Sequence, residues 1–222
     1  MSELTLGDGS TICSMTPRIR IQPSPAVENV PSRAYSVPSL SIGLSALLTD
    51  LATCLNWYRL ASPGLYCCIH PTLELPDNHV VVPGVVLMAN HGKHRHASPE
   101  PNFERFRGAP NFVADVFSSD TSLDYSDRKH RFAAAGIEEY LAVFDTEPLS
   151  WEWNVLNQAE FNLLKPQQDG IIRSSALPGL WFPEVAFAGR DWWTLMAAIT
   201  RGVTRRGHHE FMHSIWHANQ IE

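Results

Sequence analysis

Apolar residues recur along this chain with two different periods, which predict helices and strands in turn. From Leu44 to Tyr58, leucines recur every three or four residues, and this spacing predicts a helix with one apolar face. Short apolar runs follow and predict strands. These runs are 65–70, 79–88 (two halves split by Pro83-Gly84), 112–117 and 139–144.

The second half of the chain continues this alternation. A polar segment that ends in three alanines and Gly136 predicts a helix over 124–136. Apolar and polar residues then alternate over 149–155, which predicts a half-buried strand, and 159–164 and 170–173 extend it into an antiparallel meander. From Asp191, a candidate N-cap, two helices are expected.

The order of these elements predicts an α/β domain around a central mixed sheet flanked by helices. Five prolines in residues 14–38 predict an irregular N-terminal arm over 1–38. We therefore divide the chain into one domain over 1–188, which includes the arm, and a C-terminal helical extension over 189–222.

Composition and charge restrict the class of protein. The formal net charge of −6 argues against non-specific coating of nucleic acid but leaves room for a basic cleft. No apolar run approaches the length that spans a bilayer, and the N-terminus lacks the pattern of a signal peptide. Four cysteines without a CxxC pair indicate reduced thiols. We expect a cytoplasmic protein with no membrane segment.

Two histidine motifs suggest metal binding, and both have a simpler explanation. Residues 209–213 match HExxH, so His209 and His213 could bind zinc on one helix face with Glu210 as the base. However, the motif lies at the C-terminus without an evident third ligand, and Phe211 and its neighbours suit ordinary packing. The run 91–96 (HGKHRH) is typical of a solvated loop.

A third candidate site lies in the strand FVADVF. Asp115 interrupts this apolar run, and a carboxylate that faced the core unpaired would be costly, so Asp115 either lies at an exposed edge or has a chemical role. The densest basic run of the chain follows at 128–131. A strand carboxylate that binds Mg²⁺, with Lys129 to activate water and offset phosphate charge, suits phosphodiester cleavage. The alternative is an ordinary structural ion pair.

The amino-acid sequences of several segments support the third candidate. These segments are Ala109–Thr121, Lys129, Ala135–Val143 and Ser174–Leu180. Leu6–Gly9 and Met15–Pro17 add a weaker N-terminal motif. In order and spacing these segments resemble the Uma-type restriction endonuclease family of the PD-(D/E)xK nuclease superfamily over about half of the chain. The resemblance implies a restriction-endonuclease-like fold with a central sheet of about five strands, Mg²⁺ as the cofactor and DNA as the substrate.

Two of the four functional positions of that family are not retained here. Asp115 matches the strand glutamate and Lys129 matches the lysine. Gly84 stands at the aspartate of the "PD" step, and Thr5 stands at the opening glutamate. Asp77 could supply the missing metal ligand only if the strand shifts by an odd number of residues, which would exchange its two faces.

Three hypotheses therefore remain open. The first is a Mg²⁺-dependent endonuclease with Asp115 and Asp77 as metal ligands and Lys129 as the base, which could act as a homodimer. The second is an inactive descendant of that fold that serves as a binding or interaction protein. The third is a zinc protease that uses residues 209–213.

Overall fold

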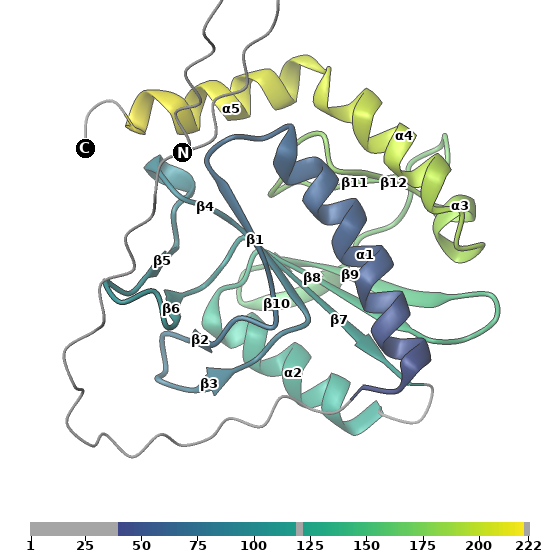
Figure 1. Cartoon of the computed structure of the whole chain (residues 1–222), viewed down its shortest axis with the longest axis horizontal. Helices are drawn as coiled ribbons and strands as arrows, with labels where there is room; N and C mark the ends of the chain where they lie inside the picture. The colour runs from purple at the N-terminus through teal and green to yellow at the C-terminus, as the bar shows by residue number, and fades with distance from the viewer. Residues whose placement is uncertain (1–39, 119–121, 220–222) are drawn as a thin grey trace, which may run out of the picture. The chain divides into compact units, whose positions relative to one another are not determined.

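The computed structural model describes residues 40–118 and 122–219, and the side chains of all of these except 122–123 and 216–219. Helices and strands alternate as predicted, and the mixed α/β class is confirmed (Figure 1). The predicted N-terminal arm, which includes Thr5 and the motif at 6–9 and 15–17, lies outside the described residues.

The main sheet has six strands in the order β1-β4-β7-β8-β9-β10, one more than the five or so expected. Only β7 and β8 are parallel, and all other neighbours are antiparallel. The strands are β1 (Leu65–Ile69), β4 (Val85–Ala89), β7 (Phe112–Phe117), β8 (Glu139–Phe144), β9 (Ser150–Asn157) and β10 (Glu160–Leu163). The middle strands β4, β7 and β8 are buried on both faces, which explains their continuous apolar sequences.

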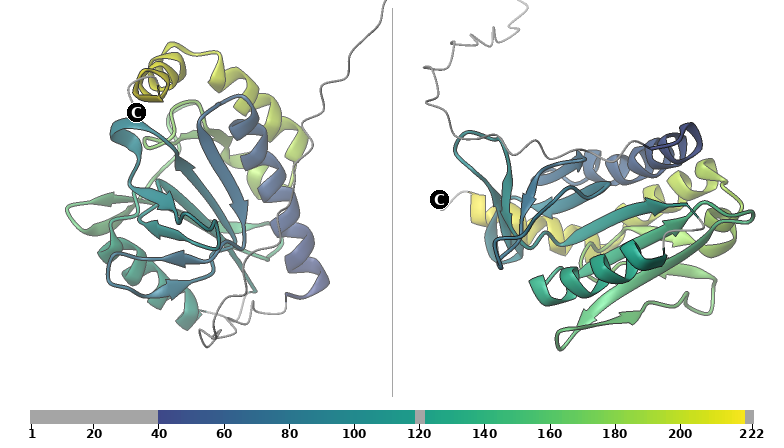
Figure 2. Two further views of the ribbon diagram at one scale, coloured as in Figure 1. Left: turned by 60° about the vertical axis from the view of Figure 1, so that its left-hand side comes forward. Right: turned by 90° about the horizontal axis from the view of Figure 1, so that it is seen from below.

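Helices cover both faces of this sheet (Figure 2). Ser41 is the N-cap of α1 (Ile42–Leu60), since its hydroxyl accepts a hydrogen bond from the Leu44 N–H. The predicted leucine stripe of α1 packs into the core on one face of the sheet. α2 (Ser122–Ala135) joins the parallel strands β7 and β8 across the opposite face. It ends before Gly136, whose φ of 86° suits glycine.

Two smaller sheets accompany the main one. The apolar run 79–88 is divided between sheets, because the chain turns at Pro83-Gly84. A four-stranded sheet has the order β3-β2-β6-β5, and a two-stranded sheet joins β11 and β12. Their strands are β2 (Leu73–Glu74), β3 (Val80–Val81), β5 (Ala97–Pro99), β6 (Phe106–Gly108), β11 (Ile171–Arg173) and β12 (Trp181–Pro183). A short 3-10 helix, η1 (Gly92–His94), lies between β4 and β5. The prediction that 170–173 extends the meander of β9 and β10 was therefore wrong, because β11 pairs with β12 in a separate sheet.

The C-terminal segment is helical, as predicted. Its helices are α3 (Glu184–Ala188), α4 (Trp192–Val203) and α5 (Arg206–Asn219). Asp191 is the N-cap of α4, since its carboxylate accepts from the Thr194 N–H at 3.0 Å. α4 packs against α1 and β12, and a Cβ at Gly202 would lie only 2.1 Å from the Gly179 carbonyl oxygen. This close approach requires glycine at position 202.

Glu139 is a buried carboxylate that fixes the loop after β11. Its two oxygens accept five hydrogen bonds, all between 2.7 and 3.0 Å. The donors are Trp153 Nε1, Ser174 Oγ, Ser175 N, Ser175 Oγ and Ala176 N. The side chain is fully buried, so these donors take the place of water around the carboxylate.

No helix in the described part of the chain is long and apolar enough to cross a bilayer. Of the four cysteines, Cys54, Cys67 and Cys68 are described, and all three are free thiols. Burial raises the pKa of Cys54 and of Cys67 to about 12, so both thiols are protonated at neutral pH.

Candidate functional site

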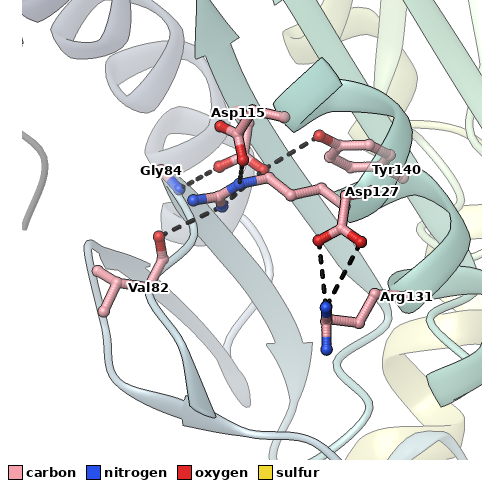
Figure 3. A network of polar contacts seen from close by, with 8 residues as sticks. Val82, Gly84, Asp115, Asp127, Arg131 and Tyr140 are labelled. Carbon is pink, nitrogen blue, oxygen red and sulfur yellow. Dashed lines mark hydrogen bonds and ion pairs between the residues drawn. The ribbon is translucent and has the colours of Figure 1, made fainter. Parts of the chain in front are cut away.

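The Asp115 carboxylate lies on the α2 side of the main sheet, and protein donors bind both of its oxygens (Figure 3). Oδ1 accepts from the Gly84 N–H at 2.6 Å. Oδ2 accepts from the Tyr140 hydroxyl at 3.1 Å and from Arg128 Nη1 at 3.3 Å. Only 7% of the side chain is exposed, so Asp115 does not lie at an exposed edge, and the protein supplies the partners that a buried carboxylate needs.

Arg128, and not Lys129, brings positive charge to Asp115. The two residues are consecutive on α2, so their side chains point about 100° apart, and only Arg128 faces β7. Its guanidinium also contacts the Val82 carbonyl oxygen and lies 3.5 Å from an Asp124 oxygen. Burial alone would lower the pKa of Arg128, but the two carboxylates outweigh burial and raise it. The guanidinium is therefore a permanent internal cation.

Tyr140 completes the set of donors. The pKa of the Tyr140 phenol is raised well above its ordinary value. Burial is the main cause, and the negative charge of the adjacent Asp115 is the second. The hydroxyl thus keeps its proton and acts as a donor to Asp115.

The backbone at Gly84 leaves no room for an acidic side chain. A Cβ built there would lie 2.8 Å from the Ala114 carbonyl oxygen and 3.1 Å from the Leu48 side chain. Contacts this short require the backbone to shift. Glycine instead lets the start of β4 approach β7 closely enough for its N–H to bind Asp115.

A pocket of about 250 Å³ opens beside this network. Leu44, Leu48 and Val82 contribute apolar walls, and Asp115, Asp124 and Arg128 contribute charge. Since Asp115 and Asp124 both contact Arg128, the single cation is shared between two anions. An added phosphate would find this guanidinium already bound and two carboxylates nearby.

Lys129 belongs to a separate polar cluster. Its ammonium lies 2.8 Å from Glu152 on β9 and over the ring of Tyr125, whose hydroxyl also binds Glu152. Burial would lower the pKa of Lys129, but its bonds to Glu152 and Tyr125 raise it. A lysine with a raised pKa is a poor general base at neutral pH.

Asp77 lies in the turn between β2 and β3, on the four-stranded sheet. Its carboxylate is half exposed and binds the backbone N–H and the ring of His79. The pKa of Asp77 is lowered, chiefly because its carboxylate accepts a hydrogen bond from the His79 backbone N–H. No contact in the described part of the chain joins Asp77 to Asp115 or Lys129. The three residues expected to converge are engaged in three separate groups of contacts.

These residues do not fit a magnesium ion. Mg²⁺ needs oxygen ligands at about 2.1 Å in a near-octahedral arrangement. Asp115 offers one carboxylate whose oxygens already accept three bonds, and a guanidinium stands beside it. The described residues contain no group of three or more His, Cys, Asp or Glu side chains that could hold a metal ion.

The basic run 128–131 is neutralised by carboxylates of the same chain. Arg128 pairs with Asp115 and Asp124, and Lys129 pairs with Glu152. Arg131 pairs with Asp127 one turn earlier on α2, at 3.1 Å (Figure 3). The cluster therefore presents much less positive charge than its sequence suggested.

The two histidine motifs lie close together in the fold. In the HExxH match on α5, Glu210 binds Arg206 Nε at 2.6 Å, and no third metal ligand joins His209 and His213 among the residues described. In the run 91–96, the ring of His94 packs on Phe211 of α5 at 5.0 Å, and η1 as a whole packs on that helix. The structure thus favours packing over metal binding in both.

Comparison with known proteins supplies a family match. Residues 17–187 match the Uma2 family, which is described as "Putative restriction endonuclease". A search of curated proteins gave no match. Among solved structures, this chain is similar to "a putative nuclease belonging to DUF820" from Anabaena variabilis. The two share 15% sequence identity, with a TM-score of 0.49, over 72% of this chain and 84% of that chain.

Proposed function

Since this chain belongs to the Uma2 family of restriction endonuclease-like proteins, we propose that it is a non-hydrolysing member whose nuclease fold acts as a binding module. One observation carries the proposal. The Arg128 guanidinium lies 3.3 Å from the Asp115 carboxylate, which a catalytic metal ion would have to contact directly. An internal cation of this kind satisfies the buried charge but cannot activate water for hydrolysis.

The backbone at Gly84 also supports the proposed loss of hydrolysis. Gly84 contributes an N–H instead of a carboxylate, and the space around it excludes an acidic side chain without a backbone shift. Metal affinity depends strongly on the number of ligands, and a single occupied carboxylate is a poor site. The fold is thus retained while its metal chemistry is lost.

The state of the basic run also argues against DNA as a ligand at this site. Arg128, Lys129 and Arg131 each bind a carboxylate of their own chain. A DNA phosphate would have to displace these contacts and approach the carboxylates that remain. Electrostatic attraction to the phosphate backbone supplies most of non-specific DNA affinity, so this surface offers little of it.

The competing function is Mg²⁺-dependent hydrolysis of DNA. Asp115 and Asp77 would then hold the ion, and Lys129 would orient or activate water. That arrangement requires all three side chains to leave their present partners and converge.

Nicking of supercoiled plasmid separates the two functions. We expect the natural protein, with Mg²⁺ or Mn²⁺, to nick plasmid no faster than the Asp115→Asn, Lys129→Ala and Asp77→Asn variants prepared in the same way. A contaminating nuclease would act equally in all four preparations. Nicking by the natural protein that disappears in Asp115→Asn would contradict the proposal.

A further inference from the structure

α1 and α4 lie side by side and share one solvent-facing surface (Figures 1 and 2). We name it the α1/α4 outer face and define it by ten exposed residues at helical spacing. They are Ile42, Ala46, Thr49, Thr53, Trp57 and Leu60 on α1, with Trp193, Ala197, Thr200 and Thr204 on and directly after α4. None of the ten is charged.

The composition of this face is unusual for a surface in contact with water. Ile42 is 92% exposed, Trp193 79% and Leu60 59%. α1 contains only two charged residues in nineteen, although its outer side faces solvent. Asp50 is the one exposed charged residue on α1, and a helix that is apolar on its core side with so little charge on its outer side is typical of one covered on both sides.

The polar groups of the face are already satisfied within their own helices. The hydroxyls of Thr49, Thr53 and Thr200 each donate to the carbonyl oxygen four residues earlier, and that of Thr204 donates to Arg201. The indole N–H of Trp57 donates to Thr200 Oγ1 at 3.0 Å and links the two helices. Burial of these four hydroxyls and of the Trp57 indole would therefore leave none of their donors unpaired, which lowers the cost of covering this part of the surface.

From these features we propose that the α1/α4 outer face binds a second copy of this chain in a symmetric dimer. In a twofold dimer the same patch meets itself, so α1 of one subunit can lie against α4 of the other. Ala46, Thr49 and Ala197 are small enough for helices to approach closely between the larger anchors Trp57 and Trp193.

Charge at the border of the face fits this partner. Asp50 lies on α1 and Arg201 on α4, both are exposed, and neither forms an ion pair within the described residues. A twofold dimer in which α1 of one subunit lies against α4 of the other can pair Asp50 of each subunit with Arg201 of the other, and the symmetry makes this pair occur twice. An unrelated partner would have to supply both opposite charges itself.

The size of the face is sufficient for a modest dimer. α1 has 19 residues and is about 28 Å long, and two packed helices are roughly 20 Å wide. The projected area is roughly 550 Å² per subunit, or about 1,100 Å² in total, which exceeds most crystal contacts (below about 800 Å²) and lies in the range of weak, reversible interfaces (below about 1,200 Å²). α4 begins at Trp192, beyond the family match that ends at residue 187, so the four residues of the face on and directly after α4 lie outside the matched region.

Sedimentation of the full-length protein over a wide range of concentrations tests this dimer. We expect a reversible monomer–dimer equilibrium. Trp193→Glu and Ala46→Glu should each raise the dissociation constant at least about 30-fold, because each change occurs twice in the interface. Leu163→Glu is the matched control: it also replaces an exposed apolar side chain, but on β10, and should leave the equilibrium unchanged.

Charge reversal gives a second test that does not depend on apolar contacts. Asp50→Arg or Arg201→Asp alone should weaken the dimer, and the two together should restore it. A monomer at every concentration would overturn the proposal. A dimer that is unaffected by Trp193→Glu and Ala46→Glu would also overturn it. The dimer does not depend on whether the Asp115 site hydrolyses DNA.

Discussion

We expect Glu139→Ala to lower the free energy of unfolding by about 4 kcal/mol. The change removes the acceptor of five hydrogen bonds and leaves the Ser175 and Ala176 N–H groups and the Trp153 indole without a partner in a dry interior. Urea denaturation followed by tryptophan fluorescence measures the loss.

Glu138 is the matched control, since it is the adjacent residue with the same side chain but is partly exposed. It accepts a hydrogen bond from Asn111 and lies 3.5 Å from His96. Glu138→Ala should cost about 1 kcal/mol. If Glu139→Ala were no more destabilising than Glu138→Ala, the role given to Glu139 would be incorrect.

Replacement of Arg128 should have the second-largest effect. Arg128→Met keeps most of the aliphatic stem but leaves Asp115 buried without a cation, and we expect a loss of about 3 kcal/mol. Thermal or urea unfolding measures it. Lys129→Met is the control from the next position: its partner Glu152 is 39% exposed, so its loss should stay below about 1 kcal/mol.

A double-mutant cycle shows whether the Arg128 effect acts through Asp115. When Asp115→Asn is added to Arg128→Met, neither charge of this buried pair remains, so the double variant should be more stable than Arg128→Met alone. Additive losses would mean that the two side chains do not interact in solution.

Local patterns predicted most of the secondary structure because each element has a local cause. The leucine spacing in α1, the Asp191 cap of α4 and Gly136 after α2 are all visible within a few residues. The division of 79–88 between two sheets was less accessible, because it depends on which distant strands pair with β3 and β4.

The candidate site was predicted only in part. Asp115 was identified because a carboxylate inside an apolar strand is costly, and the structure supplies the partners that this cost requires. Arg128 was missed in favour of Lys129, although hydrophobic spacing on α2 could have distinguished them: Arg128 is four residues before the buried Phe132 and so shares its face. The role of Tyr140 had no sequence signal, since its contact with Asp115 depends on the pairing of β7 with β8.

The proposed function requires that the Arg128 guanidinium takes the place of a metal ion at Asp115. The most direct measurement is a titration of the natural protein and of Asp115→Asn with Mn²⁺, followed by electron paramagnetic resonance. We predict that the two proteins give superimposable titrations, with no stoichiometric ion that depends on Asp115. One Mn²⁺ bound per chain by the natural protein, and lost in Asp115→Asn, would contradict the account.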